Sequence, residues 1–159
     1  MIYLALLAAG AIVAADQWLK ALAAHYLAPI GTRPLIDGVL HLTYVENRGM
    51  AFSLMEGHTW LLVWVTGLIL LGLLAYLLFG KDHSAFLKFS LAAIIGGGAG
   101  NLIDRIFSGY VVDYIDFRLI NFAVFNFADI CVCLGTVALM VYILLLEPRR
   151  QKKDRSDDL

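Results

Sequence analysis

The amino-acid sequence predicts an all-α membrane protein with four transmembrane helices and a small β-hairpin outside the membrane. Of its 159 residues, 61% are hydrophobic and only 16% are charged, whereas soluble domains carry roughly 25% charged residues. The apolar residues gather into four stretches, each long enough to cross a bilayer as a helix. We therefore expect one integral membrane domain over residues 1–159.

The four predicted spans cover residues of about 1–22, 60–79, 88–106 and 129–147. An alternative for the first stretch is a cleaved signal peptide, because Ala9-Gly10-Ala11 resembles a small-residue cleavage site. No Lys or Arg precedes it, which argues against that alternative. We expect the first stretch to remain a membrane helix.

Basic residues predict the orientation of these spans. Five of them lie in the tail at 148–159, and Lys81 and Lys88 flank the loop between the second and third spans. Basic residues favour the cytoplasmic side of a membrane. Both termini are therefore expected in the cytoplasm, with segments of about 21–58 and 105–128 outside.

The two outer segments differ in their patterns. In "PLIDGVLHLTYV", apolar runs flank Asp37-Gly38, a dipeptide typical of tight hairpin turns, so we predict a small β-hairpin or sheet there. The second segment, "GYVVDYIDFRLINFAVF", is too polar in its first half to span but rich in aromatic residues. It is expected to lie on the outer membrane surface.

Several classes of function find no support. There is no basic stripe interleaved with aromatic residues, so nucleic-acid binding is not expected. The four histidines are scattered without His-Glu-x-x-His, so no metal site or cofactor is predicted, and no Gly-x-Ser-x-Gly suggests a serine triad. Cys131 and Cys133 point in different directions on a helix and are expected to be small core residues.

Three carboxylates fall at one predicted depth. Counting about 1.5 Å per helical residue from the cytoplasmic ends places Asp16, Asp104 and Asp129 near the outer boundary of the membrane. Any one of them alone fits an interfacial anchor. Together they are costly unless paired or hydrated, and are therefore candidate functional groups.

Polar residues accompany these acids at helical spacing. In "DQWLK", Asp16 and Lys20 are spaced for an ion pair within one helix. In "GGGAGNLIDRI", Asn101, Asp104 and Arg105 share one helical face, as a functional surface or as a self-satisfied polar network. The same stretch carries glycines at a spacing that lets helix backbones approach closely in lipid, at Gly96 and Gly100.

A further polar cluster ends the first outer segment. In "ENRGMAF", an amide, small residues and an aromatic follow one another at Asn47, Gly49, Ala51 and Phe52. This composition suits a loop that approaches a ligand backbone, and an ordinary turn explains it equally well.

Paired acids offer a chemistry that needs no metal. "VVDYIDF" supplies Asp113 and Asp116, and "FNFAD" supplies Asn126 and Asp129 one helical turn apart. Asp116 precedes Arg118, which suits a solvated surface charge. Two carboxylates that share a proton can cleave an amide, one activating water and the other hydrogen-bonding the carbonyl. The sequence alone does not show which two acids meet.

The motifs "DQWLK", "NRGMAF", "GNLIDR", "VVDYIDF" and "FNFAD" together resemble those of lipoprotein signal peptidase, the bacterial type II signal peptidase. Their order, their spacing and the four spans cover almost the whole chain. The resemblance implies an aspartic endopeptidase that removes the signal peptide of a prolipoprotein before its diacylglyceryl-modified cysteine. It also implies an external β-cradle, which agrees with the predicted hairpin.

The resemblance assigns roles to individual residues. Asp113 and Asp129 correspond to the catalytic pair, and Tyr114 stands where the family usually has phenylalanine. The substrate-binding and supporting positions that it implies are Asn47, Gly49, Asn101, Asp104, Arg105, Asn126, Asp16 and Lys20.

The resemblance also implies location and partners. It places the enzyme in the bacterial cytoplasmic (inner) membrane, with its active site near the outer face, acting on diacylglyceryl-modified prolipoproteins in contact with membrane lipid. Globomycin-type inhibitors are expected to bind, and a monomer is expected, although the sequence does not settle the oligomeric state. Two alternatives are a small proton or ion carrier that uses the carboxylates as relays and a non-catalytic assembly factor whose glycine-rich span docks a partner.

Overall fold

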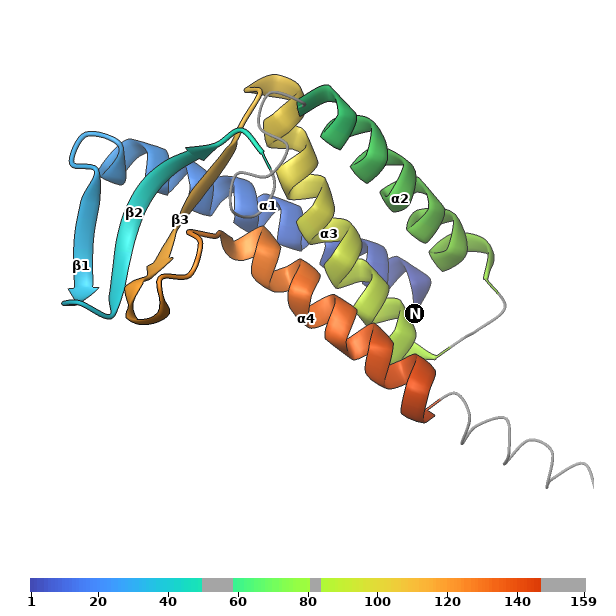
Figure 1. The fold of residues 1–159 in the computed structure, drawn as a ribbon. Coiled ribbons are helices and arrows are strands. Elements are labelled where there is room, and N and C mark those ends of the chain that lie inside the picture. The colour runs from blue at the N-terminus through green and yellow to red at the C-terminus, as the bar shows by residue number, and fades with distance from the viewer. Residues whose placement is uncertain (50–58, 81–83, 147–159) are drawn as a thin grey trace, which may run out of the picture.

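Four helices and a small sheet make up the part of the chain that the structure describes, residues 1–49, 59–80 and 84–146 of a computed structural model (Figure 1). The helices are α1 (Ile2–Leu27), α2 (Thr59–Phe79), α3 (Ala85–Phe107) and α4 (Phe127–Val141), and α4 continues as a π-helical turn over Tyr142–Leu146. The strands are β1 (Thr32–Ile36), β2 (Leu40–Asn47) and β3 (Val111–Phe117), followed by a 3-10 turn at Arg118–Ile120.

All four helices are long and apolar enough to cross a membrane, which confirms the predicted fold class. Helix α3 is central, because it packs against α1, α2 and α4. Helix α1 continues to Leu27, beyond the predicted end near residue 22. Its last turns stay helical because Ala23 and Leu27 pack against Tyr114 of β3, a tertiary contact that the local sequence does not reveal.

Small residues let α1 and α3 approach closely. A methyl group on Gly96 would lie 2.8 Å from the carbonyl oxygen of Ala9, and one on Gly100 would overlap the carboxylate of Asp16. The prediction that these glycines are packing positions is confirmed. The consequence at Gly100 is functional as well as structural, since the bare backbone leaves room for a buried acid between two helices.

The sheet has the order β1-β2-β3, with both pairs antiparallel. The hairpin predicted around Asp37-Gly38 is confirmed, and Gly38 adopts the positive φ of 68° that favours glycine in such a turn. The third strand comes from the second outer segment. The sequence analysis expected that segment to lie on the outer membrane surface and assigned it no strand, so β3 was not predicted.

An irregularity in β2 sets which side chains face which acid. The pairs Leu42↔Ile115 and Val45↔Asp113 leave two residues of β2 opposite one of β3. Such a bulge reverses the alternation of side chains along the strand that carries it. Thr43 and Asn47 therefore reach acids that lie on opposite faces of β3.

Two hydrophobic clusters enclose a polar layer. One lies between α1, α2, α3 and the π-helical turn that continues α4, and contains Ala5, Ala9, Leu77, Leu87, Leu91, Ala92 and Tyr142. The other joins the end of α1 to the sheet through Ala23, Leu27 and Tyr114. Asp16 and Lys20 occupy the intervening turns of α1 and are 0% and 3% exposed.

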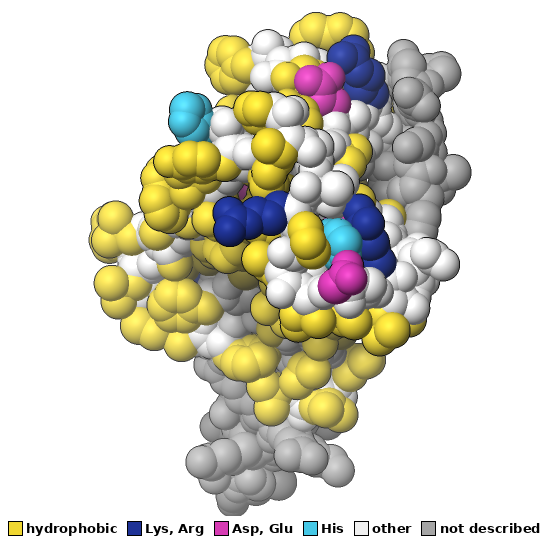
Figure 2. All heavy atoms as spheres, turned by 90° about the vertical axis from the view of Figure 1, so that its left-hand side faces the viewer, with side chains coloured by type: hydrophobic (Ala, Val, Ile, Leu, Met, Phe, Trp, Pro, Cys, Tyr) yellow, Lys and Arg dark blue, Asp and Glu magenta, His cyan; other side chains and the backbone are white. Residues whose placement is uncertain are grey.

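Most of the outward-facing surface of the helices is apolar, as a lipid environment requires. Exposed apolar side chains also occur on the sheet and its flanking turns, at Ile30, Leu35, Ile36, Leu119 and Ile120. Figure 2, which views the molecule from the sheet end, shows hydrophobic side chains spread between a few charged ones.

Candidate active site

The start of α4 is held by four hydrogen bonds, one for each of the N–H groups that a helix leaves without a helical acceptor. Asn126 and Asp129 form a reciprocal capping box, in which each side chain accepts from the backbone N–H of the other, at 3.0 and 3.1 Å. The Phe127 N–H donates to the Tyr114 hydroxyl at 3.3 Å, and the Ala128 N–H donates to Asp16 at 3.2 Å. Asp129 is thus fixed by a fully capped helix end.

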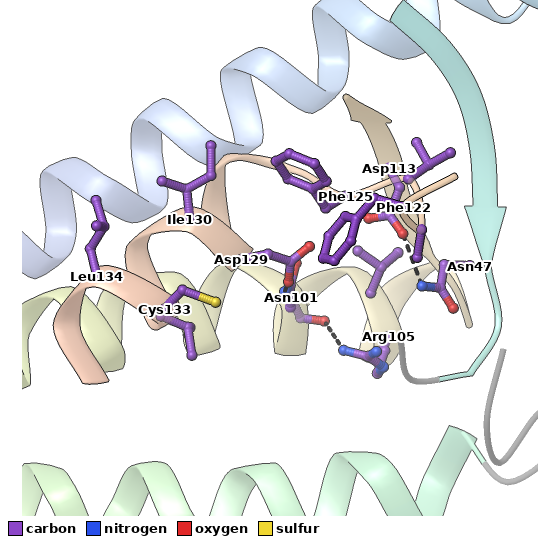
Figure 3. A pocket seen from close by; sticks show the side chains of 14 residues that line it. Asn47, Asn101, Arg105, Asp113, Phe122, Phe125, Asp129, Ile130, Cys133 and Leu134 are labelled. Carbon is purple, nitrogen blue, oxygen red and sulfur yellow. Dashed lines mark hydrogen bonds between the residues drawn. The ribbon is translucent and has the colours of Figure 1, made fainter. Parts of the chain in front are cut away.

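Asp113 and Asp129 are brought together by Asn126. The Asn126 amide donates to Asp113 Oδ1 at 2.7 Å, while its backbone N–H donates to Asp129 Oδ2. Both carboxylates line the same cavity, and Figure 3 shows them on its wall with Asn47 beside Asp113. Two acids from separate segments, β3 and α4, therefore share one site.

The environment of Asp113 favours its neutral form. Burial, which leaves the residue 2% exposed, is the main cause that raises its pKa to about 6, and the nearby negative charge of Asp129 raises it further. Hydrogen bonds from Asn47 at 2.9 Å and from Asn126 partly oppose this shift in pKa. The acid is thus able to hold a proton near neutral pH.

A cluster of polar side chains centred on Lys20 is linked to Asp129 through Asn101. Lys20 contacts Asp16 at 2.8 Å and Asp104 at 2.9 Å, and its ammonium donates to Asn101 Oδ1 at 2.8 Å. The Asn101 amide in turn donates to Asp129 Oδ1 at 2.7 Å. The predicted ion pair within α1 is confirmed, and the acids of three helices meet at one level, as the counting of helical residues indicated.

Arg105 and Asn47 line the same polar part of the cavity as the two acids. Arg105 donates to the Gly49 carbonyl at 2.8 Å and to the Asn101 carbonyl at 3.4 Å. Its Nε is buried without a partner among the described residues. The guanidinium therefore keeps donor capacity for a bound carbonyl group.

The cavity measures about 440 Å³ and has two unlike ends. Its polar end carries Asn47, Asn101, Arg105, Asp113 and Asp129. Its apolar end is formed by α4, at Ile130, Val132, Cys133 and Leu134. Further apolar residues line the cavity at Val111 and over residues 122–125, and Figure 3 shows Phe122 and Phe125 beside the two acids. A ligand with a polar and an apolar part fits such a site.

Two sequence predictions are wrong at this site. Cys133 is exposed and lines the cavity, because two helical residues turn the chain by about 200° and only Cys131 faces the core. Asp116 is not a solvated charge: it is 8% exposed, accepts from Thr43 at 2.7 Å and pairs with Arg118 at 2.7 Å. The bulge in β2 turns Thr43 toward Asp116, and the Arg118 side chain reaches back to the same carboxylate.

Sequence reasoning missed two contributors. Gln17 donates to Asp104 at 2.9 Å and to the Gly100 carbonyl at 3.2 Å. The Tyr114 hydroxyl accepts a hydrogen bond from the first turn of α4, which a phenylalanine at this position could not do. The sequence offered one indication of a role for Tyr114, which is that it directly follows the predicted catalytic residue Asp113. The proposed ligand-loop positions Ala51 and Phe52 and the tail at 148–159 lie outside the described residues.

Within the described parts of the chain, no group of three or more His, Cys, Asp or Glu side chains is arranged to hold a metal ion. In the described polar layer, Lys20 pairs with two of the acids, Asp16 and Asp104. Lys20 and Arg105 are its two cations, and its four acids are Asp16, Asp104, Asp113 and Asp129.

Comparisons with known proteins converge on one family. Residues 8–145 match the family model described as signal peptidase (SPase) II. A lipoprotein signal peptidase of Clostridioides difficile is 44% identical over 138 residues, which cover 87% of this chain and 93% of that protein. One from Halalkalibacterium halodurans is 36% identical over 147 residues, 91% and 94% of the two chains. A solved bacterial membrane enzyme superposes with a TM-score of 0.84 at 28% identity, covering 91% and 89%.

Proposed function

The chain belongs to the signal peptidase II family, and from that premise we propose that Asp113 and Asp129 are the catalytic pair of an aspartic endopeptidase. Family membership makes the chain a protease that removes signal peptides from prolipoproteins, and its four apolar helices make it a multi-pass inner-membrane protein. The observation that carries the proposal is the meeting of two carboxylates from different segments on one cavity wall.

The two acids take different roles. Asp113, whose pKa is raised to about 6, carries the proton and hydrogen-bonds the scissile carbonyl. Asp129 accepts the proton of a water molecule, which attacks the carbonyl carbon. Collapse of the tetrahedral intermediate breaks the C–N bond, and the proton held by Asp129 passes to the leaving amine.

The unlike ends of the cavity orient the substrate. Asn47 and Arg105 offer donors to the peptide backbone at the polar end, and the apolar residues of α4 face the diacylglyceryl group. The bond cut is then the one before the lipid-modified cysteine. A globomycin-type inhibitor would compete for the same cavity.

Location follows from the same arrangement. In the described spanning helices, acidic side chains occur only at Asp16, Asp104 and Asp129, and these acids belong to one contact network. That network disfavours a carrier, which needs acids at several depths. The basic residues of the tail and the loop between α2 and α3 support termini in the cytoplasm, and hence a site near the outer face.

The test uses purified enzyme in detergent micelles or lipid and two precursor peptides that differ only in the diacylglyceryl group on cysteine. The lipid-modified peptide should be cut before that cysteine, as mass spectrometry of both products would show. The unmodified peptide should be cut at least about 10²-fold more slowly, because remote binding energy is lost. Asp129→Asn should abolish cleavage, and full turnover by that variant would refute the pair.

A further inference from the structure

Lys20 contacts Asn101, and Asn101 contacts the proposed catalytic residue Asp129, so Lys20 is linked to that acid through one side chain. It is 3% exposed and is not among the residues that line the cavity, so it cannot touch a substrate there. Its ammonium has three protons and three acceptors, on Asp16, Asp104 and Asn101, at 2.8, 2.9 and 2.8 Å. Its donor capacity is therefore completely used.

The contact with Asn101 determines how that amide is turned. An ammonium only donates, so the face of the amide toward Lys20 must be its oxygen. The NH₂ group then points to Asp129 Oδ1, at 2.7 Å. Asn126 follows the same polarity, since its NH₂ donates to Asn101 Oδ1 at 3.1 Å and to Asp113 Oδ1.

We propose that Lys20 is a positioning residue for the proposed reaction: its ammonium, together with the Asn126 amide, holds the Asn101 amide in the orientation that donates to Asp129. This inference rests on the function proposed above. In this series of hydrogen bonds, Lys20 donates to Asn101 and Asn101 donates to Asp129, so each donor is directed toward the proposed catalytic acid. The shared proton of the pair is thereby confined to the sides of Asp113 and Asp129 that these amides leave free.

Loss of the ammonium removes the shorter and charged of the two donors to Asn101 Oδ1, and leaves only the neutral Asn126 amide at 3.1 Å. Asn101 can then turn its oxygen toward Asp129, where oxygen faces oxygen without a hydrogen between them. The charged groups around the pair are Lys20 and Asp16 on α1, Asp104 and Arg105 on α3, and each partner acid. Lys20 lowers the pKa of Asp113 through its charge, so its removal raises that pKa.

A simple Lys20→Met change would strand two buried acids and could prevent folding. The informative comparison therefore starts from the double variant Asp16→Asn/Asp104→Asn, in which Lys20 still meets amide oxygens. Adding Lys20→Met gives a triple variant that contains no unpaired acid in this group. The two proteins differ only in the charged donor to Asn101 Oδ1, and both keep the donor from Asn126.

A matched control is Gln17→Leu. Gln17 contacts Asp16 at 3.3 Å and Asp104 at 2.9 Å but, among the described residues, has no hydrogen bond to Asn101. This change disturbs the same buried acids and leaves the Asn101 amide locked. Its loss of kcat should be much smaller than the loss between the double and triple variants, and the alkaline limb of its pH profile should not move.

Steady-state cleavage of the lipid-modified peptide across pH gives the readout. Relative to the double variant, the triple variant should lose kcat by about 10²-fold from misplacement of Asp129. Its KM should change little, and the loss of activity on the alkaline side should move to higher pH. Asn101→Ala, which keeps Lys20 paired with both acids, should reproduce the kcat loss.

Equal kcat and equal pH profiles in the double and triple variants would overturn the role of Lys20, as would unaltered kcat in Asn101→Ala. The Asn101→Ala result tests the role of Lys20 even if the triple variant does not fold. Asp113→Asn separates the two proposals. If it is inactive while the triple variant is fully active, only the positioning role fails; if it is active, the catalytic pair fails and the positioning role with it.

Discussion

Two aspartates on β3, three residues apart, show how the same side chain acquires opposite properties. Both are buried, Asp113 at 2% and Asp116 at 8% exposure. Asp116 meets a guanidinium and a hydroxyl, from Arg118 and Thr43. Asp113 meets two neutral amides and the negative charge of Asp129.

The pKa values diverge accordingly. Burial raises the pKa of both acids, but at Asp116 the hydrogen bonds from Thr43 and Arg118 and the positive charge of Arg118 outweigh it, so the pKa is lowered. At Asp113 the amides do not outweigh burial, and the pKa rises to about 6. Burial alone therefore does not mark a catalytic acid; the charge of its neighbours does.

The largest expected effect separates the two acids by turnover. Asp113→Asn should lower kcat for the lipid-modified peptide by roughly 10³-fold or more, because the shared proton is lost. Asp116→Asn should change kcat by less than about threefold, since Asp116 does not line the cavity. Steady-state peptide cleavage measures both, and a comparable loss in the two variants would remove the distinction.

Next in size is the influence of one catalytic acid on the other. The charge of Asp129 raises the pKa of Asp113, so Asp129→Asn should lower that pKa from about 6. It should stay above the value of an exposed aspartate, because burial remains. Titration of the Asp113 carboxyl by infrared spectroscopy measures this shift, and an unchanged pKa would show that the acids do not interact.

A smaller shift of opposite sign should follow Asn47→Ala. The Asn47 amide stabilises the charged form of Asp113 through its 2.9 Å hydrogen bond, so its loss should raise the pKa of Asp113 further. The alkaline limb of the activity profile should then move to higher pH. A move to lower pH would mean that the amide acts chiefly on the substrate.

The smallest effect concerns stability. Asp116→Asn should reduce the free energy of unfolding at neutral pH by roughly 1 kcal/mol, because the ion pair with Arg118 is lost. Since the folded pKa of Asp116 is lowered, its contribution is complete above the unfolded pKa and fades as pH falls through the folded value. Denaturation of both proteins at neutral and acid pH checks this: the difference should shrink in acid.

The sequence predicted much of this architecture for physical reasons. Long apolar stretches reveal spans because unpaired backbone groups are excluded from lipid. Helical spacing of three and four residues revealed the Asp16–Lys20 pair and the face shared by Asn101 and Arg105, because a straight helix has only one periodicity. The resemblance then indicated that Asp113 and Asp129 belong together.

Other features depend on contacts between distant segments. The pairing of β3 with β2 and the bulge opposite Tyr114 have no local signature, so Asp116 was expected at the surface. The exposure of Cys133 depends on which face of α4 meets the cavity. The hydroxyl of Tyr114 is useful only because α4 begins beside it.

The most direct test of the account is the pKa of Asp113 in the unaltered enzyme, from the difference between its pH-dependent infrared spectra and those of Asp113→Asn. A protonated carboxyl signal that is absent from the variant and titrates near pH 6 is the predicted result. If Asp113 is already ionised at pH 5, as Asp116 should be, then it does not hold the proton on which the proposed mechanism depends.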